Sequence, residues 1–182
     1  MARKGKAPRR VLIVDGYNII NARRGGGQAM NANTLADARE KLIDELMDYA
    51  GYSEQQVVLV FDAWMSDRTV RTEEKRGGVT VVYTQKGEIA DRYIERLCDD
   101  LAPDIDLRRV EVRVASSDGL EQTIILGRGA TRMSARELMV EMEQLRMAGI
   151  RQVVQKPVSR RSPISDRLSP EVMKRLEELR KK

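Results

Sequence analysis

The stretch VLIVDGYNII, residues 11–20, carries the pattern that decides the fold. Its first four residues are aliphatic without interruption, which is typical of a short β-strand covered on both faces. The apolar run ends at Asp15, and Gly16, Tyr17 and Asn18 follow. A carboxylate after a strand is commonly a turn residue or a helix N-cap. The alternative is an active-site carboxylate that the strand holds in place, and the rest of the chain has to decide between them.

Other apolar runs repeat this pattern and alternate with segments of helical periodicity. Strands are predicted at residues 57–61, 79–83, 110–115 and 150–154. Helices are predicted over residues 35–50, 88–101, 119–126 and 135–147. Thr34 and Gly51 are the expected ends of the first helix, and Gly149 is the expected C-cap of the last. Because strands alternate with helices, the sequence predicts an α/β fold with a mainly parallel sheet.

Three local features complete this assignment. Ser134 and Glu137 form the pattern of a capping box at the start of the helix at 135–147. Residues 21–33 are rich in glycine and polar side chains and predict a loop, and residues 63–78 predict a helix or a loop. The segment 25–27 consists of three glycines but lacks the Lys-Ser/Thr of a phosphate-binding loop, so it predicts only a flexible connection.

The two ends of the chain differ from its body in charge. Residues 1–10 carry five basic and no acidic side chains, and residues 156–182 carry nine basic and four acidic ones. The body between them has 19 basic and 24 acidic residues. We expect a basic disordered N-terminus at 1–9, one α/β domain at 10–155, and a basic linker with a C-terminal helix at 156–182. Basic ends on an acidic body suggest a polyanionic partner, although solubilisation explains the same charges.

Composition excludes several kinds of active site. The chain has no histidine, which removes Ser-His-Asp and Cys-His catalysis, His-paired acid–base chemistry and His-ligated zinc. Cys98 is the only cysteine, so an intrachain disulfide is impossible. No apolar run approaches the roughly 20 residues of a membrane span, and the N-terminus lacks a secretory apolar segment. We therefore expect a cytoplasmic protein without a membrane partner, in which carboxylates, a lysine or a hard metal do any chemistry.

Acidic residues follow three of the predicted strands. Asp15 and Asp62 come directly after the first two strands, and Asp118 follows the strand at 110–115. Each of them alone is explained by a turn or a helix cap. In a parallel sheet, however, the carboxyl ends of the strands meet at the edge where ligands bind. The sequence therefore predicts that the three carboxylates converge there.

The helix predicted over residues 88–101 adds further acids. Glu88, Asp91 and Glu95 are three and four residues apart and share a helix face. The inner apolar stripe is expected to consist of Ile89, Tyr93, Ile94 and Leu97. Asp91 lies nearer to that stripe than Glu95, and so is better placed to point inward. Carboxylates held close together repel, and they either take up protons or bind a cation. Oxygen ligands without histidine or cysteine suit Mg²⁺ or Mn²⁺.

Four segments together resemble the NYN domain family. VLIVDGYNII, VVLVFDAW, TQKGEIADRYIERL and VASSDGLEQ occur in this order. They are most similar to its YacP-like branch, within the PIN-like nuclease superfamily, over about residues 9–155. The resemblance implies a three-layer α/β/α sandwich with a mainly parallel sheet. It also implies a metal-dependent endoribonuclease that cuts single-stranded RNA, with messenger RNA on the ribosome as the expected substrate and the ribosome as the expected partner.

The resemblance also implies roles for individual residues. The expected ligands of Mg²⁺ or Mn²⁺ are Asp15, Glu88, Asp91 and Asp118, with Glu88 and Asp91 sharing the helix position. Asn18 is expected to orient the scissile phosphate or a ligand water, and Asp62 to act as a supporting acid. Basic residues near these positions are expected to contact phosphates: Arg23, Arg24, Arg68, Arg71, Lys86 and Arg128. Tyr17 and Trp64, beside the acids, can stack a base or simply pack on the domain.

Two other functions fit parts of the same pattern. An inactive NYN-like module would bind RNA or the ribosome without cutting, but such a module gains nothing from acids that repel phosphate. A phosphatase would use Asp15 as the nucleophile. Aspartyl-phosphate phosphatases of the haloacid dehalogenase type usually carry a second Asp two residues later, where this chain has Tyr17. The acid pattern therefore favours the nuclease interpretation.

Overall fold

A six-stranded, mainly parallel sheet forms the centre of the protein. The computed structural model describes residues 7–25, 30–63, 69–116 and 129–155. The strands are β1 (Arg9–Asp15), β2 (Gln56–Phe61), β3 (Thr72–Arg76), β4 (Val79–Tyr83), β5 (Val110–Ala115) and β6 (Thr131–Met133). The helices are α1 (Gly16–Arg23), α2 (Ala32–Ser53), α3 (Ala90–Asp106) and α5 (Ala135–Gln155). The predicted strands at residues 11–14, 57–61, 79–83 and 110–115 are confirmed.

The order of the strands places β1 in the middle of the sheet. The order is β3-β4-β2-β1-β5-β6, and every neighbouring pair is parallel except the antiparallel pair β3–β4. The chain runs from β1 outward through β2 to β4, and then crosses to β5 on the other side of β1. The direction of winding therefore reverses at β1, and in open α/β sheets ligands bind at such a reversal, beyond the carboxyl ends of the strands.

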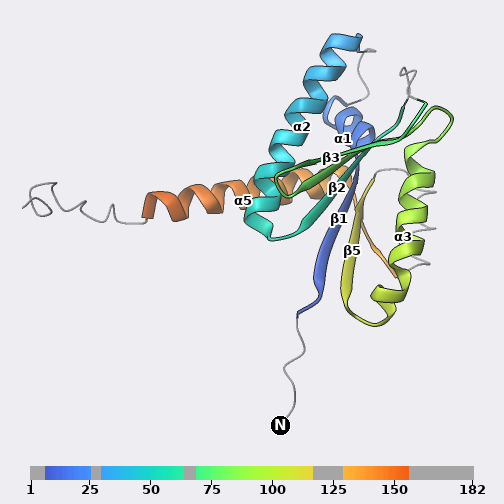
Figure 1. Ribbon diagram of the computed structural model, residues 1–182. Coiled ribbons are helices and arrows are strands. Elements are labelled where there is room, and N and C mark those ends of the chain that lie inside the picture. The colour runs from blue at the N-terminus through green and yellow to red at the C-terminus, as the bar shows by residue number, and fades with distance from the viewer. Residues whose placement is uncertain (1–6, 26–29, 64–68, 117–128, 156–182) are drawn as a thin grey trace, which may run out of the picture. The chain divides into compact units, whose positions relative to one another are not determined.

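Each central strand is buried on both faces. Leu12 and Val14 of β1 belong to one hydrophobic cluster, and Val11 and Ile13 belong to the other. Alternate side chains of a strand point to opposite faces, so the two clusters mark the two sides of the sheet. Figure 1 shows α2 and α3 on opposite sides of the strands. The three-layer α/β/α architecture predicted from the family resemblance is thereby confirmed.

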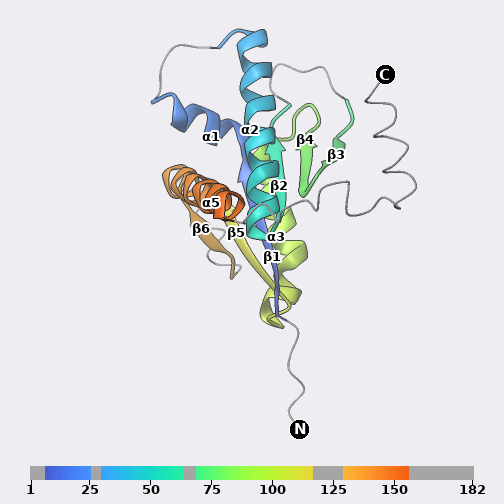
Figure 2. The same ribbon diagram turned by 90° about the vertical axis from the view of Figure 1, so that its left-hand side faces the viewer.

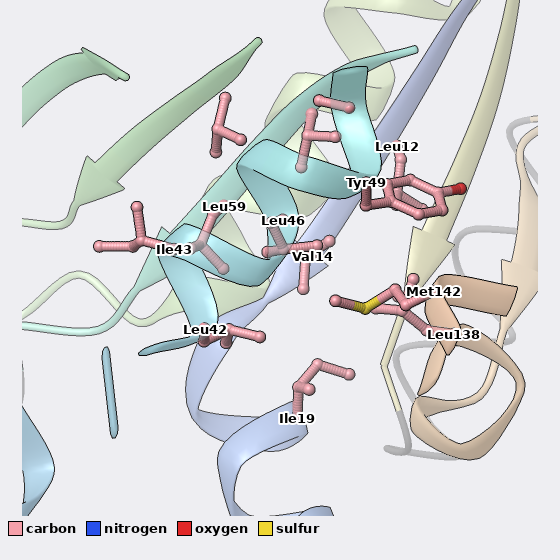
Figure 3. Close-up of a cluster of buried hydrophobic side chains, with 14 of the residues drawn as sticks. Leu12, Val14, Ile19, Leu42, Ile43, Leu46, Tyr49, Leu59, Leu138 and Met142 are labelled. Atoms are coloured by element: carbon pink, nitrogen blue, oxygen red, sulfur yellow. The ribbon is translucent and has the colours of Figure 1, made fainter. Parts of the chain in front are cut away.

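Helices α1, α2 and α5 cover one face of the sheet, as the turned view shows (Figure 2). Ile19 of α1, Leu46 of α2 and Leu138 of α5 are fully buried there against β1 and β2 (Figure 3). Helix α3 covers the other face with Ile94 and Cys98, which are also fully buried. Among the helices that the structure describes, α3 is the one that packs on this second cluster, so its first turn lies near the carboxyl end of the sheet on this face.

A polar network fixes α5 to the first of these faces. The Tyr49 hydroxyl donates to Glu141 Oε1 at 2.6 Å, and Arg113 of β5 donates to both Glu141 oxygens at 2.8 and 2.9 Å. Gln55 joins the network through both its amide nitrogen and its amide oxygen. Burial and the hydrogen bond to Glu141 raise the pKa of Tyr49 to about 12. The hydroxyl therefore stays protonated and donates throughout the physiological range.

Several helix boundaries differ from the predictions. Gly16–Arg23 is a helix, whereas residues 21–23 were predicted to be loop. Helix α2 begins after Asn31, which caps it by accepting from the Thr34 amide at 2.8 Å, and it runs through Gly51 to Ser53. Helix α3 begins at Ala90, so Glu88 precedes it, and Ile89 is 49% exposed instead of lying on the inner face. The buried stripe of α3 consists of Ala90, Ile94 and Cys98.

The strand predictions fail at the edges of the sheet. Strand β3 has the sequence TEEKR with only polar side chains, and it lies in the segment predicted to be a helix or loop. It is held by backbone pairing with β4, which apolar periodicity does not reveal. The predicted strand at 150–154 is wrong, because α5 continues to Gln155 through the predicted C-cap Gly149. The last strand is the three-residue β6, directly before Ser134.

The remaining predictions have mixed outcomes. The capping box of α5 is confirmed, because Ser134 N donates to Glu137 Oε2 at 2.7 Å and Glu137 N donates to Ser134 Oγ at 3.2 Å. The helices predicted at 119–126 and in the C-terminal segment lie outside the described ranges, and so do residues 1–6 of the N-terminus that was predicted to be disordered over 1–9. Arg9, the last residue of that prediction, belongs instead to β1. The α/β body extends to Met147, and residues from Ala148 onward form a separate compact unit. Of the helices described, none combines the length and the apolar composition that crossing a membrane requires.

Candidate active site

Asp15 lies at the carboxyl end of the central strand and is 9% exposed. Its Oδ1 accepts a hydrogen bond from the Asn18 amide at 3.0 Å, so Asp15 is the N-cap of α1. The two interpretations of this residue are therefore compatible, because a carboxylate has lone pairs left after capping. Asp15 continues the alternation of Val11 and Ile13, and its side chain leaves β1 on the face covered by α3.

Asp62 leaves the neighbouring strand on the same face. In β2 the residues Val58 and Val60 pack against the α3-side cluster, and Asp62 is the next residue in this alternation. The register agrees with this placement, because Asp15 pairs with Val60 and Asp62 therefore lies two residues beyond that level. The sheet alone thus brings Asp15 and Asp62 to one edge and one face.

Asp91 approaches the same edge from the helix. It is the second residue of α3, in the first turn, and it precedes the buried residues Ile94 and Cys98 by three and seven positions. Residues at these spacings lie on one side of an α-helix, so Asp91 lies along the side of α3 that packs on the sheet. The predicted inward placement of Asp91 therefore follows from the helix as observed.

The charges of Asp91 and Asp62 act electrostatically on Asp15. Burial and, to a smaller extent, the negative charges of Asp91 and Asp62 together raise the pKa of Asp15 to about 6, against an opposing hydrogen bond from the Asn18 amide. A like charge shifts a pKa only when it is near and incompletely screened. Asp15 is therefore ionised at neutral pH, and its ionised form lowers the free energy of unfolding. A cation bound beside it would offset this destabilisation.

The fourth predicted acid, Asp118, lies outside the described residues. Its strand β5 reaches the same edge, because Ala115 pairs with Val14, and Ser116 beyond it is 1% exposed. Within the described part of the chain, no three acidic or cysteine side chains lie close enough together to hold a metal ion. A metal site at this edge of the sheet, and the contribution of Asp118 to it, therefore stay predictions.

Glu88 has a different environment from the one expected of a metal ligand. Arg71 binds it in a bidentate manner, with Nη2 at 2.6 Å from Oε1 and Nε at 3.2 Å from Oε2, and Arg96 also donates to Oε1. Burial raises the pKa of Glu88, but the hydrogen bonds from the two arginines outweigh it and hold this pKa below its usual value. The carboxylate is therefore neutralised by two guanidinium groups.

The predicted phosphate-contacting residues fall into three groups. Arg71 is bound to Glu88 and lies over the Tyr93 ring at 4.7 Å from its centroid, and Arg23 forms an ion pair with Glu45 at 2.6 Å. Arg24, the C-cap of α1, and Lys86, in the turn before α3, are exposed. Arg68, Arg128 and the predicted stacking residue Trp64 lie outside the described residues.

Gly16 and Tyr17 hold the start of α1 against β2. A Cβ atom on Gly16 would lie 2.3 Å from the nearest carbon of the Phe61 ring. Tyr17 packs on the same ring with centroids 5.2 Å apart, and its hydroxyl accepts from Arg39 at 3.1 Å. The motif DGYN is thus explained by packing as well as by chemistry. The glycine leaves space for the Phe61 ring, and the tyrosine anchors the helix that Asp15 caps.

Sequence analysis missed two residues that shape the site, Phe61 and Thr84. Phe61 is fully buried in the strand run VVLVF, where nothing distinguishes it from other core residues. Thr84 follows β4 and is also fully buried, although its residue type and its place after a strand suggest an exposed turn. The sequence did offer a reason to consider Thr84, because it occupies the end of the strand beside the one that Asp62 follows.

Comparison with known proteins identifies the family to which this chain belongs. The sequence matches the family model for the YacP-like NYN domain over residues 12–181. It is 35% identical over 171 residues to the uncharacterized protein YacP of Bacillus subtilis, covering 94% of this chain and 96% of that protein.

Solved structures of the same protein extend the match to the fold. The crystal structure of Rae1 (YacP) from Bacillus subtilis superposes with a TM-score of 0.65 at 35% identity, covering 94% of each chain. The crystal structure of a mutant form of Rae1 superposes with a TM-score of 0.65 at 34% identity, covering 87% of this chain and 89% of that one. The family-model match over residues 12–181 includes the positions of Asp15, Asp62 and Asp91. This chain belongs to the YacP-like NYN domain family, a membership that supports a nuclease-type function.

Proposed function

We propose that this protein is a metal-dependent endoribonuclease that hydrolyses phosphodiester bonds of single-stranded RNA. The observation that carries the proposal is that Asp15, Asp62 and Asp91 lie at the carboxyl end of the sheet on the face covered by α3, where the charges of Asp62 and Asp91 act on Asp15. Asp15, whose pKa is raised by burial and by the charges of Asp91 and Asp62, weakens folding when it is ionised unless a ligand compensates its charge. A cation and the phosphate chemistry that it serves would explain its presence.

The donor set suits Mg²⁺ or Mn²⁺. The candidate ligands are hard carboxylate oxygens, the chain has no histidine, and Cys98 is buried in the α3-side core. Asp15 and Asp91, with Asp118, are the residues that would hold the ion. When bound, such a cation would supply neutralisation of phosphate oxygens and activation of the attacking water.

The protein's own side chains position the substrate around these acids. Asn18 lies in the first turn of α1, three residues after Asp15, where its amide can orient a phosphate oxygen. Asp62 contributes to the negative potential that favours a cation. The exposed Arg24 and Lys86 are placed to contact backbone phosphates on either side. Phosphate contacts position the strand without reading its sequence, so base preference comes from other groups.

Messenger RNA on the ribosome is the substrate that we propose within this class. The proposal follows from the resemblance to the YacP-like branch together with the excess of basic residues at 1–10 and 156–182. Basic segments bind polyanions such as ribosomal RNA through a strongly salt-dependent contribution. A cytoplasmic location follows from the same substrate.

Cleavage by the purified chain tests the function directly. We expect it to cut a labelled single-stranded RNA in Mn²⁺ or Mg²⁺, and EDTA should abolish the cut. Asp91→Asn should lower the rate by more than about 100-fold, because it removes a ligand charge while keeping the side-chain shape. Asp100→Asn, the same change at an exposed position of α3, is the matched control and should cut normally.

Ribosome-bound messenger RNA is assayed in parallel with naked RNA. Cleavage only on the ribosome would support the substrate assignment, and cleavage of both would support the broader class alone. Binding of RNA without cleavage of either substrate by the wild-type protein would show that the chain is a binding module and would refute the enzymatic proposal.

Glu88→Gln separates the two roles considered for Glu88. Because its oxygens accept from Arg71 and Arg96, we expect Mn²⁺ affinity to stay within about two-fold while KM for RNA rises several-fold, as the charge-assisted hydrogen bonds that orient both guanidinium groups weaken. Isothermal titration with Mn²⁺ and steady-state cleavage kinetics measure the two effects. Glu111→Gln, an exposed change at the start of β5, serves as the control. Loss of Mn²⁺ affinity in Glu88→Gln would restore Glu88 as a metal ligand.

A further inference from the structure

Thr84 connects the end of β2 to the segment that leads into α3. Its side chain is 0% exposed. Its hydroxyl oxygen accepts a hydrogen bond from the Ala63 amide at 2.8 Å, and the hydroxyl proton is donated to the Glu88 carbonyl oxygen at 2.7 Å. The Thr84 amide in turn donates to the Phe61 carbonyl at 3.0 Å. One residue thus joins two segments that lie 25 residues apart in the chain.

Both connected segments carry proposed site acids. Ala63 directly follows Asp62, and Glu88 precedes Asp91 by three residues. The pairing of Phe61 with Tyr83 brings Thr84 level with Asp62 at the edge of the sheet. The charges of Asp62 and Asp91 both act on Asp15, which is the electrostatic consequence of this closeness. The hydroxyl of Thr84 therefore lies where a small shift would change the spacing of the acids.

The hydrogen bond from Thr84 to the turn before α3 joins residues that are close in the sequence. The hydrogen bond that Thr84 accepts from the end of β2 joins residues that are far apart in the sequence. The Glu88 amide donates to the Gln85 carbonyl at 2.9 Å, so residues 85–88 form a turn that the Thr84 hydroxyl closes. Ile89, the N-cap of α3, has no side-chain hydrogen bond to the helix. The turn closed by Thr84 is therefore the fixed point from which α3 begins, and the Ala63 bond attaches this point to the sheet.

We infer that Thr84 is a positioning residue of the active site, whose hydroxyl holds the Asp62 end of β2 and the Asp91 turn of α3 at the separation that metal binding and cleavage require. The inference rests on the proposed function and deepens it. It assigns to Thr84 no contact with substrate or metal. Outer residues of this kind orient the ligands of a metal, and their removal commonly costs about 10- to 100-fold in affinity or activity.

The shape of threonine allows the hydroxyl to be tested by itself. Valine has nearly the same volume and the same β-branching, but it can neither accept from Ala63 nor donate to Glu88. Both backbone groups would then be left without this partner in a buried place, and the two segments would separate or recruit water. Serine keeps the donor and the acceptor while losing only a methyl group.

The experiment compares Thr84→Val, Thr84→Ser and Thr80→Val in the full-length chain, well below their unfolding temperatures. Thr80→Val is the matched control, because Thr80 lies half-buried on β4, the strand that Thr84 follows, four residues farther from the site. The measurements are kcat and KM for RNA in saturating Mn²⁺, the dissociation constant of Mn²⁺ without RNA, and hydrogen exchange of the Ala63 amide. If Thr84→Val does not fold, Thr84→Ala replaces it.

We expect Thr84→Val to lower kcat and Mn²⁺ affinity by about 10-fold or more, with KM for RNA within about two-fold. Its Ala63 amide should exchange faster, and Thr84→Ser should recover most of each loss. Wild-type kcat and Mn²⁺ affinity in Thr84→Val would overturn the inference, as would an equal loss in Thr80→Val or no recovery in Thr84→Ser. An active wild-type protein beside an equally active Thr84→Val refutes the inference alone. A wild-type protein that neither binds Mn²⁺ nor cuts RNA refutes the proposed function, and the inference with it.

Discussion

Asp15→Asn is expected to abolish RNA cleavage and, at neutral pH in EDTA, to raise the free energy of unfolding by about 2 to 3 kcal/mol. The gain arises because burial, together with the charges of Asp91 and Asp62, raises the pKa of Asp15 from 3.8 to about 6. Asparagine is neutral, caps a helix as well as aspartate does, and can still accept from the Asn18 amide. For a chain of this size the midpoint of thermal unfolding should rise by roughly 5 to 10 °C.

The pH dependence of the stability difference between Asp15→Asn and the wild type tests whether the ionised carboxylate causes this difference. A carboxyl group whose pKa is higher in the folded protein binds its proton more tightly there, so the free energy of unfolding falls as pH rises from about 4 to about 6. Asp15→Asn lacks this contribution, so its advantage over the wild type should be nearly complete at neutral pH and mostly gone at about pH 4. Thermal unfolding of both proteins across this range, with Asp100→Asn as control, measures it. An equal midpoint at neutral pH would mean that ionised Asp15 is not destabilised by its surroundings.

Gly16→Ala is expected to lower the free energy of unfolding by about 2 kcal/mol and to reduce cleavage strongly, because the added methyl group overpacks the core. The new Cβ would lie 2.3 Å from a carbon of the Phe61 ring. That ring is fully buried between Tyr17 and Tyr83, with centroid distances of 5.2 and 5.6 Å, so it has no room to turn aside. Helix α1 must move instead, and Asp15, which caps it, must move with it.

Gly51→Ala is the matched control for this change. Gly51 lies inside α2 with nothing within 4 Å of its added Cβ, so alanine should stabilise the protein by about 0.5 to 1 kcal/mol. Chemical denaturation measures both variants. Phe61→Leu in the Gly16→Ala background should cost less than the sum of the single changes, because the smaller side chain makes room for the methyl group. Strict additivity would contradict a clash between residues 16 and 61.

The central part of the fold was predictable because the strands there are buried on both faces. An uninterrupted apolar run such as VLIV or VVLVF fits a strand between two helical layers, whatever its neighbours are. The capping box at Ser134 was equally readable, because its two hydrogen bonds join residues three positions apart. In both cases, the information that decides the structure lies within a few residues.

The errors lie where the structure depends on partners distant in sequence. Strand β3 exists because β4 offers an unpaired edge, and its five polar residues show no apolar alternation. Helix α5 passes through Gly149 to Gln155, although a glycine at the end of a periodic stretch usually marks a helix end. Helix α1 follows a strand without a loop because Asp15 caps it, a role that the sequence left open beside the chemical one.

The sequence by itself determined the chemical types available to the site and where along the chain they occur. Without histidine, acids after strands were the remaining candidates, and the parallel-sheet rule predicted that Asp15 and Asp62 meet at one edge of the sheet. Only the tertiary structure decided that Glu88 is bound by Arg71 and Arg96, that Gly16 leaves space for Phe61, and that Thr84 joins Ala63 to Glu88. The physical reason is the distance along the chain over which each interaction acts. Periodicity and capping act over a few residues, whereas ion pairs, steric contact and buried hydrogen bonds depend on which distant segments the folded sheet brings together.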